Sequence, residues 1–304
     1  MNKIFQKFCD LYPHYKLNTY FKKKIFYLIF SVFKIFLSGP FQLNFKKFKF
    51  FAYPQKKNYS RSLLTKINLH DEGEINFFNN NIDSESIFID CGANQGFYSI
   101  PIAGNHPECK IYAFEPSYQE MHLLEENIKL NNFNNITPLK LAIAEKEGSF
   151  KFKDDNIESH STKGGFIIDE KNDNTLEKIS IIKATTLDKF IDDLKVNKNK
   201  KIFIKIDLEG YDFNAIYGCK NIINEYKTII LFEFSKMAIQ NKIYNFEEFE
   251  KFLLNNNLII LDINLNSISL LDLNRKLEKL EKKFDVLGNF LIIKKDNLNI
   301  IKQL

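Results

Sequence analysis

Carboxylates stand at the ends of four apolar runs in this chain. The acids are Asp90, Glu115, Asp207 and Glu233, and Glu209 lies just beyond the third run. Carboxylates can accept hydrogen bonds from hydroxyl groups, act as general bases or bind a divalent cation. Asp also favours turns, which would explain one or two such endings, but four in succession indicate a shared site.

The first two acids belong to a strand, turn, helix and strand in residues 86–116. An apolar run ends on Asp90, a turn follows with Gly92 and Gly96, and a second apolar run ends on Glu115. This pattern is typical of half of a mononucleotide-binding α/β unit. Glycines at such a turn let a ligand approach bare backbone, and the second acid can accept two hydrogen bonds from ribose hydroxyls.

The elements that must position these acids alternate between strand and helix, as in a mostly parallel sheet. We expect helices at residues 70–82, 95–103, 117–131, 186–194, 245–254 and 273–280. We expect strands at residues 86–91, 110–115, 136–142, 149–153, 180–183, 201–207, 228–232, 258–263, 267–271 and 290–293. Pro138 suggests that its strand lies at an edge or begins late. Ligands of open α/β sheets bind outside the carboxyl ends of the strands, so the acids should converge there.

Length and charge divide the chain into two parts. The 304 residues, 44% of them apolar, suffice for one large α/β domain with an appendage. Residues 1–66 carry 14 Lys and Arg against one acid (+13), which leaves 29 bases and 37 acids (−8) for the remainder. We therefore expect a basic, Phe-rich N-terminal arm at 1–66 and a catalytic domain at 67–304. Four cysteines without a CxxC pair favour a reduced, cytoplasmic protein without a disulfide frame or zinc site.

The arm leaves two interpretations open. Residues 25–37 form a 13-residue apolar run that includes Lys34, whereas a membrane span needs about 20 apolar residues. This run could be a helix packed on the domain, or an interfacial helix whose lysines face anionic lipid, which would make the protein membrane-peripheral. Residues 43–51 alternate aromatics with lysines and predict a strand or hairpin. Such residues can also bind nucleic acid, but no recognised motif accompanies them and we expect no nucleic-acid partner.

Six short segments, in this order, resemble the FkbM family of S-adenosylmethionine-dependent methyltransferases. They are residues 90–96 (DCGANQG), 113–116 (AFEP), 123–131 (LLEENIKLN), 186–188 (TLD), 205–210 (KIDLEG) and 230–233 (ILFE). The resemblance covers about residues 70–235, with Asp212 standing where the family usually carries Glu. It implies a Rossmann-like class I methyltransferase fold, with a mostly parallel seven-stranded sheet, helices on both faces and a final antiparallel strand. It also implies S-adenosylmethionine as donor and O-methylation of a sugar or glycan hydroxyl.

The resemblance also implies roles for individual residues. The residues expected to contact the cofactor are Asp90, Gly92, Asn94, Gly96, Glu115 and Ala142. Gly92, Asn94 and Gly96 would cradle the methionine end, and Asp90 would orient their turn and reach the methionine amine through water. Glu115 would hold the ribose hydroxyls. Ala142 would lie beside adenine, or would simply belong to the core.

Methyl transfer to a hydroxyl needs alignment and a group that removes the proton. Asp207, Glu209 and Glu233 are candidate bases, and His160 in a polar loop is another. Alternatively, Asp207 and Glu233 hold a magnesium ion that lowers the hydroxyl pKa. In the simplest structural interpretation, Asp207 and Glu209 instead pair with Lys205 and cap the next helix.

Other functions make different demands on the sequence. A nicotinamide-dependent sugar enzyme would need GxGxxG, but the turn at residues 92–96 reads GxxxG. A nucleic-acid methyltransferase would use the basic arm. A membrane-peripheral or nucleic-acid-associated protein could retain the cofactor fold without turnover, and a methyltransferase could act on a non-sugar small molecule. We expect the acceptor to be a glycan or a small molecule, and the oligomeric state stays open.

Overall fold

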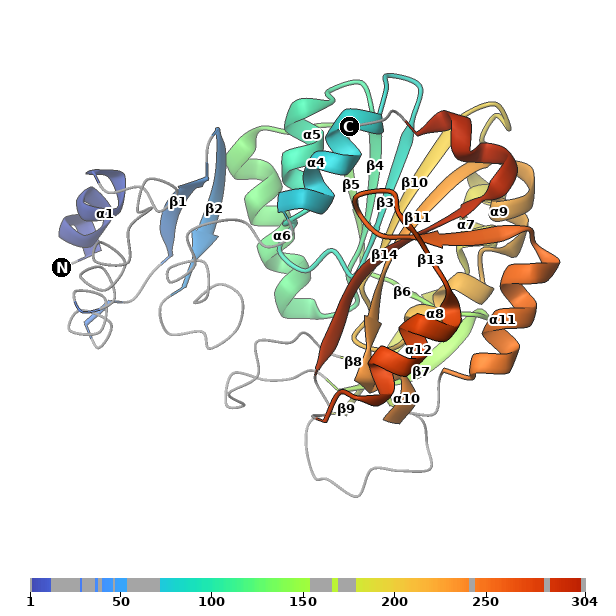
Figure 1. The fold of residues 1–304 in the computed structure, drawn as a ribbon. Coiled ribbons are helices and arrows are strands. Elements are labelled where there is room, and N and C mark those ends of the chain that lie inside the picture. The colour runs from blue at the N-terminus through green and yellow to red at the C-terminus, as the bar shows by residue number, and fades with distance from the viewer. Residues whose placement is uncertain are drawn as a thin grey trace.

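The chain is built around a twisted, mostly parallel sheet (Figure 1). The computed structural model describes residues 2–11, 28, 36–37, 40–45, 47–53, 72–153, 166–168, 179–240, 244–281 and 285–301. Eight strands form the large sheet, in the order β13-β12-β14-β11-β10-β3-β4-β5. They are β3 (Ile87–Cys91), β4 (Lys110–Phe114), β5 (Ile136–Leu139), β10 (Lys201–Ile206), β11 (Lys227–Ser235), β12 (Leu258–Leu261), β13 (Ser267–Ile268) and β14 (Val286–Lys294).

Strand direction in this sheet confirms the expected Rossmann-like class I methyltransferase fold. The neighbours from β5 through β4, β3 and β10 to β11 pair in parallel, and β14 lies antiparallel beside β11. The expected count of seven strands is one too few, because the short β13 adds an eighth at the edge next to β12. The run at 267–271 is a strand only over its first two residues, and its last two residues belong to α12 (Leu270–Glu278).

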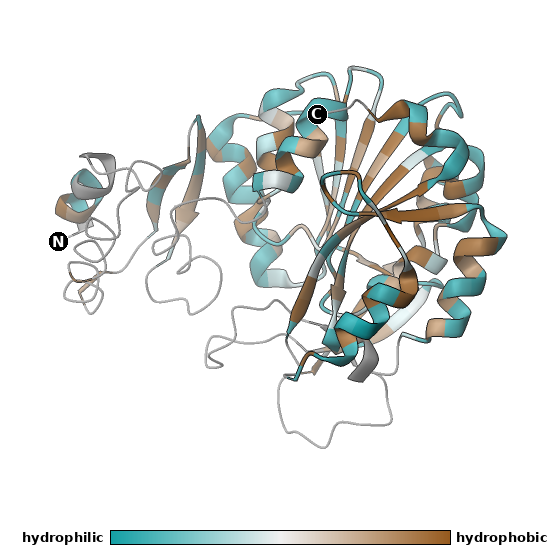
Figure 2. Ribbon diagram, viewed as in Figure 1, coloured by the Kyte–Doolittle hydropathy of each residue, from teal (hydrophilic) through white to brown (hydrophobic). Residues whose placement is uncertain are grey.

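Helices cover both faces of the sheet, and each face has its own apolar cluster. One face packs α4 (Glu72–Asn81), α5 (Ser99–Asn105) and α6 (Tyr118–Asn131). The other packs α7 (Leu187–Leu194), α8 (Asp212–Tyr217), α9 (Lys220–Glu225), α11 (Phe246–Asn255) and α12. Figure 2 shows the strands brown between helices that are largely teal on their outer sides. Parallel strands covered on both faces read as continuous apolar runs, which is how the sequence presents them.

Two expected strands have different ends in the structure. The run at 136–142 is broken by a tight turn in which the Leu141 amide bonds the Leu139 carbonyl at 2.9 Å. Its first half is β5, which lies at the sheet edge and begins at Ile136, so of the two possibilities that Pro138 left open the edge position is confirmed. Its second half, β6 (Ala142–Ile143), joins a separate sheet with β7 (Gly148–Lys153), β8 (Phe166–Ile168) and β9 (Ile179–Thr185). The run at 228–232 continues to Ser235, because β14 pairs with its last residues.

The N-terminal arm contributes a helix and a hairpin. Helix α1 (Asn2–Leu11) lies against strand β1 (Phe41–Phe45), where Phe5 meets the Phe41 ring edge to face. Strands β1 and β2 (Phe48–Ala52) form the predicted hairpin. Most of the run at 25–37 lies outside the described residues, so the choice between packing and lipid contact stays a prediction. Among the described helices, none is long and apolar enough to cross a membrane.

Candidate functional site

The register of the parallel strands brings the predicted acids into line. Cys91 of β3 pairs with Phe114 of β4 on one side and with Ile206 of β10 on the other, and Ile206 pairs with Phe232 of β11. The next row, at the carboxyl edge of the sheet, consists of Gly92, Glu115, Asp207 and Glu233. Asp90 lies two positions earlier on β3.

The turn after β3 has left-handed backbone at Gly92 (φ 77°), Asn94 (φ 51°) and Gly96 (φ 91°). A Cβ on Gly92 would lie 2.1 Å from the Asp207 carbonyl oxygen, and one on Gly96 would lie 2.9 Å from Cδ1 of Leu124. Both glycines are therefore required by the protein's own close packing, rather than only by a ligand's approach. The turn also delays the helix expected at 95–103, which begins at Ser99.

Glu115 is almost fully buried beside this turn, with 6% of its surface exposed. Its Oε2 accepts the Asn94 amide and its Oε1 accepts the Ser117 amide, each at 2.9 Å. Burial raises the pKa of Glu115 to about 8, with nearby Glu120 adding to the rise and the two amides opposing it. The carboxyl is thus fixed in place, but its ionised form is incompletely stabilised by the protein alone.

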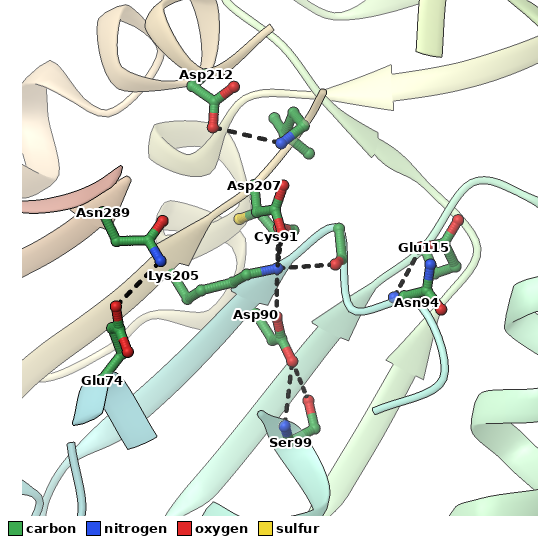
Figure 3. Close-up of polar contacts among 12 residues, drawn as sticks. Glu74, Asp90, Cys91, Asn94, Ser99, Glu115, Lys205, Asp207, Asp212 and Asn289 are labelled. Carbon is green, nitrogen blue, oxygen red and sulfur yellow. Dashed lines mark hydrogen bonds and ion pairs between the residues drawn. The ribbon is translucent and has the colours of Figure 1, made fainter. Parts of the chain in front are cut away.

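Asp90 and Lys205 form a buried ion pair beneath the turn (Figure 3). Asp90 Oδ2 accepts the Ser99 hydroxyl at 2.6 Å and the Ser99 amide at 3.2 Å, and Oδ1 lies 3.6 Å from Lys205 Nζ. Burial raises the pKa of Asp90, while Lys205 and Ser99 lower it. Asp90 therefore holds the start of α5 and pairs with Lys205, which itself bonds the turn. Its complete burial gives no support to the predicted contact with a ligand amine through water.

Lys205 contacts both the turn after β3 and Asp207 at the end of β10. Its Nζ donates to the Gly92 carbonyl at 2.9 Å, lies 3.3 Å from Asp207 Oδ2 and sits over the Tyr98 ring at 5.2 Å. Sequence reasoning treated Lys205 only as a partner for Asp207 and Glu209 and missed its contact with the turn. The available signal was a lysine inside the apolar run of a buried strand, where an unpaired charge is strongly disfavoured.

Asp212 fixes the backbone of the segment after β10. The Asp212 carboxylate accepts the amide of Gly210 at 3.1 Å and that of Leu208 at 3.4 Å. Burial raises the pKa of Asp212 to about 8, and Asp207 adds to the rise. Asp207 pairs with Lys205, as the simplest structural interpretation expected, and the N-cap residue of α8, Tyr211, makes no side-chain capping bond. The Asp207 side chain stays 35% exposed at the edge.

A model of the methyltransferase FkbM domain matches residues 90–259, which is more than half of the chain. The chain belongs to the FkbM methyltransferase family. The matched residues contain the strand ends, the turn and the carboxylates described above. No curated protein matches the chain.

Three solved structures show what this FkbM-family chain is similar to. A precorrin-6y C5,15-methyltransferase from Geobacter metallireducens GS-15 is 13% identical, with a TM-score of 0.37 over 75% of this chain and 87% of that one. Methyltransferase FkbM from Methylobacillus flagellatus KT is 14% identical, with a TM-score of 0.40 over 77% of this chain and 52% of that one. M. jannaschii TYW2, in complex with AdoMet, is 13% identical, with a TM-score of 0.37 over 83% and 84%. The match thus spans about half of the Methylobacillus protein, and likeness at these identities concerns the fold alone.

The remaining predicted residues of the FkbM-family site lie in different surroundings. Glu233 lies within β11 rather than at its end, half-buried and opposite Asn289 of β14. Asn289 donates to Glu74 Oε1 of α4 at 3.2 Å (Figure 3). Ala142 is buried in β6 and pairs with Ala184 of β9.

Two predictions of the FkbM-family site gain nothing from the structure. His160 lies outside the described residues. Within the part of the chain that the structure describes, no three His, Cys, Asp or Glu side chains are grouped to hold a metal ion. The magnesium site suggested for Asp207 and Glu233 is therefore unsupported.

Proposed function

We propose that this FkbM-family chain binds S-adenosylmethionine and transfers its methyl group to a hydroxyl of a sugar or glycan. The observation that carries the proposal is the setting of Glu115 at the carboxyl edge of the sheet. Two backbone amides fix its oxygens, and burial raises its pKa to about 8.

A ligand with two neighbouring hydroxyls fits this carboxylate. Each Glu115 oxygen accepts one amide in the structure, and a carboxylate oxygen can accept a second donor. Hydroxyl donors would stabilise the ionised form that burial disfavours, so binding would relieve the electrostatic strain. The ribose of the proposed cofactor has such a pair of hydroxyls. The adjacent turn at residues 92–96, held by Lys205 and Asp90, would receive the amino-acid end.

When bound, S-adenosylmethionine supplies a methyl group that is already activated for in-line displacement. The chain must then align the acceptor and take up the hydroxyl proton. We assign the proton to Asp207, because its partly exposed carboxylate lies in the same row as Glu115. Lys205, 3.3 Å from Asp207 Oδ2, would hold this carboxylate in position. Glu209 and Glu233 are the alternative bases within the described residues.

The polar groups near Lys205 favour a hydroxyl-rich acceptor. Asn289 and Glu74 lie beside Lys205 (Figure 3). Glu233 is on the same side of the sheet, because it stands two positions beyond Leu231, the pairing partner of Lys205 on β11. Carboxylate and amide groups supply the acceptors and donors that sugar hydroxyls pair with. The family resemblance points to the same class of acceptor.

The test has two stages. Calorimetry with S-adenosylmethionine and S-adenosylhomocysteine should show binding at a single site. The protein should then transfer a labelled methyl group to glycans or sugars, but not to nucleic acid. Transfer only to a non-sugar small molecule would overturn the proposed class of acceptor, but the proposed methyltransferase activity would stand. Absence of binding to either cofactor form would overturn the whole proposal.

A further inference from the structure

Asn127 of α6 joins the N-terminal hairpin to the turn after β3. Its side chain is completely buried. Its Oδ1 accepts the Phe51 amide of β2 at 2.8 Å, and its Nδ2 donates to the Gln95 carbonyl of the turn at 2.9 Å. One amide group thus satisfies backbone atoms from two segments that lie far apart in the sequence.

The connection continues from Gln95 to Glu115. The Gln95 amide donates to the Asn94 side-chain oxygen at 2.9 Å, and the Asn94 amide donates to Glu115 Oε2 at 2.9 Å. The Gln95 side chain is completely buried and donates to Glu120 Oε2 at 2.8 Å. Only Gln95 and Asn94 therefore separate Asn127 from the carboxylate assigned to the ribose.

An aromatic contact also joins the N-terminal hairpin to the turn after β3. Phe97, in the same turn, stacks on Phe50 of β2 with ring centroids 5.5 Å apart and planes 27° apart. Both rings belong to the apolar cluster on the α4–α6 face. The hairpin thus touches the turn through one stacked ring as well as through Asn127.

We propose that Asn127 is a positioning residue for the turn that binds the cofactor, and that it couples the N-terminal hairpin to that turn. The inference rests on the proposed function, because it assumes that the turn and Glu115 hold S-adenosylmethionine. Buried hydrogen bonds of a side-chain amide hold a defined geometry. Leaving the buried Gln95 carbonyl without a hydrogen-bond donor is unfavourable. Cofactor binding and hairpin docking should then stabilise each other reciprocally.

Asn131, one helical turn along α6, supplies a matched control. Its Oδ1 accepts the Lys49 amide at 2.9 Å, and its Nδ2 donates to the Lys49 carbonyl and to the Asn127 carbonyl. It therefore holds the same hairpin strand with the same chemistry, but its three partners belong to β2 and α6 rather than to the turn.

The first experiment compares N127D with N131D in the full chain. In its ionised form, aspartate still accepts the hairpin amide at either position, but it cannot donate to the carbonyl. We expect N127D to bind S-adenosylmethionine about tenfold more weakly and N131D to bind within about twofold of the wild type. Equal affinity of N127D and the wild type, or equal weakening by both variants, would overturn the proposal.

The second experiment measures amide hydrogen exchange in the wild-type protein. S-adenosylmethionine should slow exchange at Phe51 more than at Lys49, whose amide Asn131 holds, and N127D should lose this difference. If N127D does not fold, the wild-type measurement decides: equal effects at both amides contradict the coupling. If the wild type binds no S-adenosylmethionine, the proposed function fails and this inference fails with it.

Discussion

The two halves of the carboxyl edge differ in how much of their charge they leave open. At β3 and β4, Asp90 and Glu115 are buried and bonded to the chain's own amides, hydroxyl and lysine. At β10 and β11, Asp207 is 35% exposed and Glu233 is half-buried. Lys205 lies between them and bonds to both. The first half thus has its carboxylates held by the protein itself, whereas the second leaves part of its carboxylate surface exposed.

We call the half at β3 and β4 the closed half and the half at β10 and β11 the open half. The largest expected effect comes from D207N in the open half. Asparagine keeps the size of the side chain but accepts no proton, so turnover should fall by about 10²–10⁴-fold with cofactor affinity retained. A matched control is D83N, because Asp83 pairs with Lys201 at the opposite end of the same strand, at 2.8 Å. The control should keep full activity in the methyl-transfer assay. Full activity of D207N would remove Asp207 from the mechanism.

A smaller but clear effect is expected from G92A at the junction of the halves. An added methyl group would meet the Asp207 carbonyl oxygen at 2.1 Å in a backbone conformation of positive φ, so unfolding free energy should fall by about 3 kcal/mol. Gly73 in α4 has nothing within 4 Å of an added Cβ. G73A should therefore be neutral or slightly stabilising. Thermal denaturation of both variants measures the difference, and equal stability would show that the turn can move away from β10.

The same comparison explains what the sequence could predict. Local sequence signals were enough to predict where β3, β4 and β10 end. An apolar run that ends in an acid, or that is followed by a glycine turn, can be recognised within a few residues. Local signals failed where distant segments decide. Strand β11 extends past Glu233 because β14, more than 50 residues later, pairs with it. Asp212 accepts the amides of Leu208 and Gly210 from a buried position that the local sequence does not reveal. The link from Phe51 through Asn127 to Gln95 joins three segments that no local pattern connects.

In the closed half, E115A should weaken S-adenosylmethionine binding by at least about tenfold, because paired bonds to a charged acceptor are lost. E115Q keeps one oxygen acceptor and should fall between E115A and the wild type. Calorimetry with each variant, alongside its thermal midpoint, separates lost contacts from lost folding. Unchanged affinity of a folded E115A protein would contradict the role of this carboxyl as the ribose partner.

The smallest expected effect is a pH dependence confined to the closed half. Burial raises the pKa of Glu115 to about 8 in the free protein, whereas hydroxyl donors of a ligand favour the ionised form and lower that pKa. Ligand binding should therefore release a proton below pH 8, so affinity should rise severalfold between about pH 6 and 8 and then level off. E115Q should bind with no such rise. Asp212 titrates in the same range, with a pKa raised to about 8, and D212N should keep the rise if Glu115 is its source. A rise that survives E115Q and disappears in D212N would place the titrating group in the open half instead.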